Sequence, residues 1–473
     1  MAIIKQFLAL PTSEGIMKFN TIVLSLFCVF LILCIGCDIK KPAARKIPPR
    51  ESLIKYCWQT FEFGLKDKNE FIRTNTIRTL GRIGNRSAID ALSSSDYGWK
   101  PTSVKTCAKI LSQLHDSSAF YALYDFANSK DFMVREYVVI GIARMSDLFQ
   151  DTVVARYLKK MMYGVDSITV DTLLYNASEI AQDKYELRAK IGMALMKIND
   201  SSGQPYMQSL AKGRTLQFRV SIANMIGEIQ PPNALELLMP FLKDSSSYVR
   251  SKALESLIKI NPKDLEPRLR HVLSNDNDED IQAIAGIALM KFDEMTSVSL
   301  LIKMLNSDDE DILSKIILSL GDVKTKPAID KVLPLLRSLT TQPSDWVRIS
   351  AIASLGNLRD YESMDLIESA LQDKSQEVRE ISVGVLSRLK GKMMLEELKS
   401  LLKEDVYSMR SVAIAGLGSI ENDSLQNEVI LPLLLDRLKN DEELIVRVRA
   451  AFTILDVLSD RKYTKQGDKA AAY

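Results

Sequence analysis

The chain has 473 residues, of which 46% are hydrophobic and 26% are charged, and its 62 basic and 60 acidic residues give a net charge of +2. This near balance provides no bulk electrostatic argument for binding nucleic acid or an acidic partner. Glycine and proline are sparse, at 20 and 15 residues, which favours helices over a turn-rich β fold.

An apolar run close to the N-terminus is the first element. Residues 21–36, TIVLSLFCVFLILCIG, contain no charged residue. The run has the length of a signal-peptide apolar core and is barely long enough to span a bilayer. Lys18 directly follows Met17, so a start at Met17 would give a compact signal sequence. We therefore predict that residues 1–36 are a signal peptide, with Met17 as an alternative start.

The end of this run, Leu33-Cys34-Ile35-Gly36-Cys37, resembles the lipobox of bacterial lipoproteins. Gly36 stands where that motif has the small residue before the cleavage site, and the resemblance implies that Cys37 becomes the lipidated N-terminus. The sequence departs from the family pattern at Cys34, where lipoproteins usually carry leucine. The implied location is the extracytoplasmic (periplasmic) side of a membrane in a bacterial cell envelope.

A basic segment follows the apolar run and leaves a second interpretation open. Residues 37–50 contain three prolines and are typical of an extended linker near lipid headgroups. Few positive charges precede the run, and the positive-inside rule would keep this basic segment in the cytoplasm. In that alternative the chain is a cytoplasm-facing, signal-anchored protein. The basic residues are Lys40, Lys41, Arg45, Lys46 and Arg50.

The rest of the chain, residues 51–460, is built from repeats. Each copy has an apolar residue often followed by arginine, then small or apolar residues, then leucine or isoleucine and often glycine. The eleven clear copies begin at positions 72, 103, 134, 187, 218, 249, 281, 312, 347, 378 and 409. The usual interval is therefore 31 residues, while the longest, from 134 to 187, predicts an irregular segment near residues 160–182. Degenerate copies are expected near Val165 and Val446.

Each copy contains two helical patterns. In the one just described, positions 1, 5, 8, 9 and 12 are apolar or small, which is the spacing of one helix face. A shorter apolar stretch precedes it, and the polar turns between them are rich in Asp and Ser, which suit helix N-capping. The pattern resembles HEAT repeats of the short type named after phycobilisome lyases. This resemblance implies an all-α fold, an α-solenoid of about 11–13 HEAT-like helix pairs whose stacked neighbours bury the apolar faces.

Arginine occupies the second position of eight of the eleven clear copies, and the exceptions are Val104, Gln282 and Leu313. An acidic residue usually stands three to six residues earlier, as Asp244 and Asp373 do. In HEAT families such residues form a ladder along the stack, in which a guanidinium satisfies turn carbonyls and a carboxylate together. We interpret these arginines as a structural ladder rather than a functional row: Arg73, Arg135, Arg188, Arg219, Arg250, Arg348, Arg379 and Arg410.

The second helix lines the concave side of HEAT solenoids, so the resemblance implies a long groove. Positions 3, 7 and 11 of that helix should form its solvent ridge. The ridge is more basic in the N-terminal two-thirds and more apolar in later copies, which suits an acidic or amphipathic segment of a protein partner. A merely solvated helix face is the alternative. The candidate groove residues are Arg78, Arg82, Arg144, Lys197, Lys259, Lys291, Ile287, Leu318 and Ile349.

No residue pattern typical of an enzyme, a cofactor site or a metal site appears. The two histidines, His115 and His271, are far apart in sequence, and no glycine-rich phosphate loop occurs. Cys57 and Cys107 are too few for a disulfide framework and fit no zinc spacing. We expect a non-catalytic scaffold without a cofactor that binds a protein and not nucleic acid. A bilin lyase, which attaches chromophores to cysteines of other proteins, is the enzyme alternative that the resemblance implies. The polar tail, residues 461–473, is expected to be disordered.

Overall fold

The computed structural model divides into two compact units, Met1–Pro48 and Pro49–Tyr473. It describes residues 48–93, 99–167, 177–204, 215–307, 309–420 and 425–459, with the backbone alone for residues 162–167 and 177–185. The predicted signal peptide (residues 1–36), Cys37, most of the linker and the tail (residues 461–473) lie outside the described residues. Residues 168–176 of the predicted irregular segment lie outside them as well.

The described part of the second unit is helical and has no strand, and its helices are first and second members of repeated pairs. The first helices are α3 (Arg50–Lys66), α5 (Arg86–Ser93), α7 (Ser117–Tyr124), α9 (Asp151–Ser167), α13 (Ala234–Leu238), α15 (Leu265–Asn275), α17 (Glu294–Lys303), α19 (Lys326–Leu339), α21 (Met364–Ser369), α23 (Leu395–Leu401) and α26 (Leu431–Asn440). The second helices are α4 (Glu70–Ile83), α6 (Pro101–Gln113), α8 (Phe132–Arg144), α10 (Ala177–Lys197), α12 (Leu216–Ile229), α14 (Ser247–Ile260), α16 (Glu279–Leu289), α18 (Glu310–Leu320), α20 (Asp345–Asn357), α22 (Gln376–Lys390), α24 (Tyr407–Ser419) and α27 (Leu444–Leu458). The predicted all-α solenoid is thereby confirmed.

Short helical turns extend or connect these helices. The 3-10 turns are η2 (Ser146–Leu148), η3 (Ser201–Gly203), η5 (Phe241–Lys243), η6 (Met304–Asn306), η7 (Tyr361–Ser363), η8 (Ala370–Gln372) and η9 (Gly391–Met394), and a π-helical turn, η10 (Gln426–Ile430), precedes α26.

In the long interval of the repeat, α9 and α10 pack together as one helix pair. Val165 therefore lies near the end of a first helix, and the expectation that a degenerate copy begins there is wrong.

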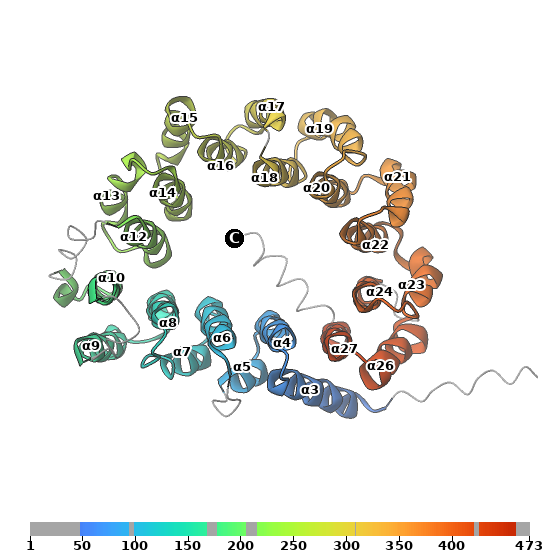
Figure 1. The fold of residues 1–473 in the computed structure, drawn as a ribbon, viewed down its shortest axis with the longest axis horizontal. Helices are drawn as coiled ribbons and strands as arrows, with labels where there is room; N and C mark the ends of the chain where they lie inside the picture. Colours follow the sequence, from blue (N-terminus) through green and yellow to red (C-terminus); the bar gives the residue numbers. More distant parts are fainter. Residues whose placement is uncertain are drawn as a thin grey trace, which may run out of the picture. The chain divides into compact units, whose positions relative to one another are not determined.

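The second helices pack against one another in chain order, and the first helices cover them from the other side, so that two layers form (Figure 1). The ninth position of each copy faces the core between these layers. It is at most 3% exposed in all eleven copies: Leu80, Leu111, Ile142, Leu195, Ile226, Leu257, Leu289, Leu320, Leu355, Leu386 and Leu417. Burying a side chain of this size contributes roughly 1.5–3 kcal/mol, so this column alone is a major source of stability.

The polar turns cap the second helices as the sequence predicts. Asp131, Asp278 and Asp309 each accept a hydrogen bond from the backbone N–H of the first repeat position, three residues later. Such a cap satisfies one of the N–H groups that a helix start leaves without an intrahelical partner. The capping residue therefore fixes where the second helix begins relative to the first repeat position.

The glycine at the tenth position explains the Leu-Gly ending of the motif. A methyl group on Gly227 would lie 2.7 Å from the Cα of Ser256, and one on Gly321 would lie 2.7 Å from the Cα of Ser354. Both serines occupy the eighth position of the following copy. Ser256 donates a hydrogen bond to the carbonyl of Ala223 at 2.8 Å. Glycine is needed here because adjacent second helices approach too closely for a Cβ.

The last second helix packs against the first helix pair, so the array of the second unit is closed. α27 contacts its own partner α26, the preceding second helix α24, and also α3 and α4 (Figure 1). Arg50 Nη2 donates to the carbonyl of Leu458 at 2.7 Å, and the Arg82 guanidinium lies 4.7 Å from the ring centre of Phe452. Because α27 has neighbours on both sides, ten of its fifteen residues are buried.

Candidate functional site

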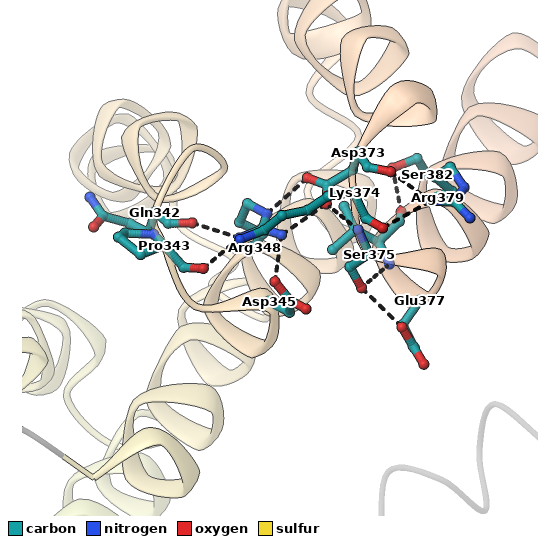
Figure 2. A network of polar contacts seen from close by, with 11 residues as sticks. Gln342, Pro343, Asp345, Arg348, Asp373, Lys374, Ser375, Glu377, Arg379 and Ser382 are labelled. Carbon is teal, nitrogen blue, oxygen red and sulfur yellow. Dashed lines mark hydrogen bonds and ion pairs between the residues drawn. The ribbon is translucent and has the colours of Figure 1, made fainter.

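Seven of the eight predicted ladder arginines lie where a turn meets the start of a second helix, and the eighth, Arg188, lies in the middle of α10. Figure 2 shows Arg348 between its own turn and the turn of the next copy. Its Nη1 donates to the carbonyls of Gln342 and Pro343, both at 2.8 Å. Its Nε and Nη2 form a fork on Asp373 at 2.9 and 2.8 Å, and Nη2 also reaches Asp345 at 2.6 Å. One guanidinium therefore satisfies two carbonyls and two carboxylates.

The carboxylate of each complete rung comes from the following copy, so the rungs connect neighbours. Four such pairs are described: Arg219–Asp244, Arg250–Asp276, Arg348–Asp373 and Arg410–Asp441. The carbonyl contacts six residues back recur at Arg73, Arg135, Arg379 and Arg410. The hydrogen bond from Arg250 lowers the pKa of Asp276, which keeps that carboxylate charged. These hydrogen bonds and ion pairs give the arginines a structural role between neighbouring copies. Arg188, within α10, is partly buried.

The last copy follows the same rule. Arg447 stands at its second position, and Nη1 donates to the carbonyl of Asp441 at 3.1 Å, six residues earlier. The copy near Val446 is therefore in register with the others, and its interpretation as degenerate is wrong. At Gln282, an exception in the sequence, the side-chain amide donates to the carbonyl of Asp276 at 2.7 Å, so part of the arginine's role is kept.

The candidate groove residues lie on second helices, which form the inner layer in Figure 1. Arg78, Arg82, Lys259, Lys291 and Leu318 are exposed. The other four candidates are partly buried: Arg144, Lys197, Ile287 and Ile349. For Lys197, burial is the main cause of a lowered pKa. None of the nine candidates is a core residue.

Several of these cations already have partners within the chain. Glu228 forms ion pairs with both Arg144 and Lys259. Lys291 donates to the Asn261 side chain at 2.8 Å, and Arg82 lies against Phe452 at the closure of the array. The inner layer is therefore less basic than the count of lysines and arginines in the sequence indicates.

The third repeat position does not belong to the exposed ridge. Glu136, Val220 and Ala283, which occupy it in three copies, are buried against neighbouring helices. By contrast, a methyl group added at the seventh position of α22, on Gly384, would meet no atom within 4 Å. The open ridge thus runs mainly along positions 7 and 11, and the expectation that position 3 shares it is wrong for these copies.

A buried charged cluster that the sequence analysis missed joins α8, α10 and α12. Lys190 is fully buried, and its Nζ lies 2.7 Å from Glu136, 2.5 Å from Glu186 and 2.6 Å from the hydroxyl of Ser221. Both carboxylate side chains are less than 10% exposed. The only sequence signal is a lysine at a position that is polar in several other copies, which does not distinguish a buried residue from an exposed one.

Residue types that could support catalysis are not assembled into a site in the described part of the chain. Cys57 and Cys107 are free and buried, and burial raises the pKa of the Cys57 thiol to about 12. Among the described residues no group of His, Cys, Asp and Glu could hold a metal ion. No described helix combines the length and the hydrophobicity that crossing a membrane requires.

Three segments of the chain, residues 205–290, 266–340 and 332–418, match a family model of HEAT repeats, so the chain contains HEAT repeats. No curated protein sequence matches it. Similar solved structures include YibA of Escherichia coli (19% identity, TM-score 0.36, covering 59% of this chain and 97% of that one). They also include the complex of CpcE and CpcF of phycocyanin lyase from Nostoc sp. PCC7120 (19%, 0.34, 55% and 94%) and Kap121p (14%, 0.35, 87% and 46%). At these TM-scores the three structures carry no information about the activity of this chain.

Proposed function

We propose that this chain is a membrane-anchored HEAT-repeat scaffold that binds a protein partner along the inner layer of second helices and catalyses no reaction. The observation that carries the proposal is the row of side chains at positions 7 and 11. These positions are exposed or only partly buried in most copies, and they lie on second helices that pack side by side along the array. A face of this length suits a macromolecular partner better than a small molecule.

The chemistry of this face changes along the array. Arg78 and Lys109 are exposed on α4 and α6. Toward the other end the seventh position carries Leu318, Gly384 and Ala415, none of which bears a charge. A partner segment with acidic residues at one end and apolar residues at the other would complement both parts. The ion pairs of Glu228 restrict the basic part mainly to the first two second helices.

Charge reversal on the inner layer tests this proposal. The double variant Arg78→Glu/Lys109→Glu is expected to reduce recovery of the partner by about tenfold or more, because two like-charge contacts oppose an acidic segment. The measurement is cross-linking in the native host followed by quantitative mass spectrometry of co-purified proteins.

The matched control carries the same charge change on first helices. Arg86→Glu/Lys326→Glu alters two side chains that are 73% and 81% exposed, and should leave recovery unchanged. If both double variants recovered the same proteins in the same amounts as the wild type, binding along the inner layer would be refuted.

The membrane anchor is tested separately. We expect mass spectrometry of the membrane-bound protein to find a diacylglyceryl-modified Cys37 as the first residue. Cys37→Ala should remove the lipid and leave the precursor uncleaved, because the modified thiol is the substrate of the cleavage step that the lipobox implies. A wild-type N-terminus that still contains residues 17–36 would contradict lipidation and favour the cytoplasm-facing signal anchor.

A further inference from the structure

The ladder of arginines has an apolar gap between two complete rungs. Arg250–Asp276 precedes the gap and Arg348–Asp373 follows it. In a complete rung, the carboxylate stands five residues before the first position of the following copy. At the copy that begins with Ile312, Leu313 replaces the arginine and Gln342 replaces the carboxylate. This copy is followed by the 35-residue interval, which contains the 14-residue first helix α19.

A cavity of about 520 Å³ lies at this gap, and Leu313 and Gln342 both line it. Leu313 is only partly buried, so the leucine does not fill the space. Ser344 also lines the cavity, and its buried hydroxyl has no hydrogen-bond partner in the described part of the chain. A buried polar group without a partner is destabilising, so a ligand group that forms a hydrogen bond with this hydroxyl would bind more tightly. The volume is within the range of binding pockets.

The lining of the cavity favours a long side chain with an apolar stem and a cationic end. Its walls are mostly apolar, with Ile317 and Val347 among them. Its polar lining residues are Gln342, Ser344 and Glu310. Two further exposed acids, Asp309 and Asp311, flank Glu310 in the sequence and disfavour an anionic ligand.

We propose that this cavity is a docking site for an arginine side chain of a protein partner, which occupies the place of the missing ladder arginine. A guanidinium has five donors in a plane, so it can reach several separate acceptors while its stem covers apolar walls. The site is at the turns beside the ladder rather than on positions 7 and 11. It therefore goes beyond the proposed binding along the inner layer and can be tested without altering that layer.

The test installs the missing rung. Random dodecapeptides displayed on phage are selected on the full-length wild-type protein in detergent. The selected peptides are then measured against Leu313→Arg/Gln342→Asp, in which the protein's own guanidinium fills the cavity. We expect the selected peptides to share an arginine at one position, and to bind the filled variant about tenfold more weakly or worse.

A matched control installs a rung elsewhere. Val104→Arg/Ser129→Asp introduces the same Arg–Asp pair at the equivalent positions of another copy that lacks the arginine, and it should bind the peptides like the wild type. Glu310→Gln provides a second variant with no added bulk, and it should weaken the same peptides several-fold. Peptides that lose binding to the filled variant but contain no arginine would overturn the proposal. Equal binding to wild type and filled variant, or selection of no peptide, would overturn it too.

Discussion

Replacing Lys190 with methionine is expected to lower the free energy of unfolding of the region around α8, α10 and α12 by about 3–5 kcal/mol. The lysine is fully buried and pairs with Glu136 and Glu186, whose side chains are 8% and 5% exposed. Methionine keeps most of the volume but leaves two buried carboxylates without a cation. Native-state hydrogen exchange of peptides from these three helices measures the change, because a repeat array need not unfold as one unit.

The triple variant Glu136→Leu/Lys190→Met/Glu186→Leu separates charge from packing. Replacing a whole buried ion cluster by apolar residues of similar volume is often neutral or stabilising. We therefore expect the triple variant to recover most of the stability that Lys190→Met loses. If Lys190→Met exchanged like the wild type, the cluster would have to be accessible to water, contrary to its burial.

Most of the repeat architecture can be predicted from the sequence because it is encoded locally in every copy. The ninth-position leucines, the capping aspartates and the glycine at the tenth position each follow from one rule of packing or hydrogen bonding that recurs at fixed spacing. Arg348 shows the same for the ladder, because its two carbonyl partners lie five and six residues before it. What repeats in the sequence also repeats in the contacts.

Features that involve one position or two distant copies are not encoded in this way. Arg144 and Lys259 appear in the sequence as free cations, but both pair with Glu228, and only the stacking of the helices brings them together. The cavity at Leu313 arises from two substitutions that are 29 residues apart in the sequence and are individually unremarkable. The contact of Arg50 with Leu458 depends on the curvature accumulated over all copies, which no single copy specifies.

Closure of the array has a consequence for binding. A second helix within an open stack has neighbours on two sides, and a terminal one has a neighbour on only one. Here α27 contacts α24 and also α3 and α4. A partner that binds the inner layer must therefore enter from an edge formed by the turns, unless α27 separates from the first helix pair. The strength of this contact determines which route is open.

Deleting the last helix pair is expected to destabilise the other end of the chain. A variant that ends at residue 420 lacks α26 and α27, and hydrogen exchange in α3 and α4 should rise by about tenfold or more. The reason is that Leu53 and Phe61, at most 2% exposed in α3, lie on a helix that packs against α27. Mass spectrometry of deuterated peptides from α3, α4 and α24 measures the effect.

A chain that ends at residue 459 is the control, because it keeps every described helix and should exchange like the full-length protein. In an open stack, the deletion of α26 and α27 would raise exchange in α24 and its neighbours and leave α3 unchanged, since each copy would stabilise only the adjacent ones. Protection of α3 in the deletion variant would therefore contradict a closed array. Equal loss of protection in α3 and α24 would mean that the two ends of the chain stabilise each other as neighbouring copies do.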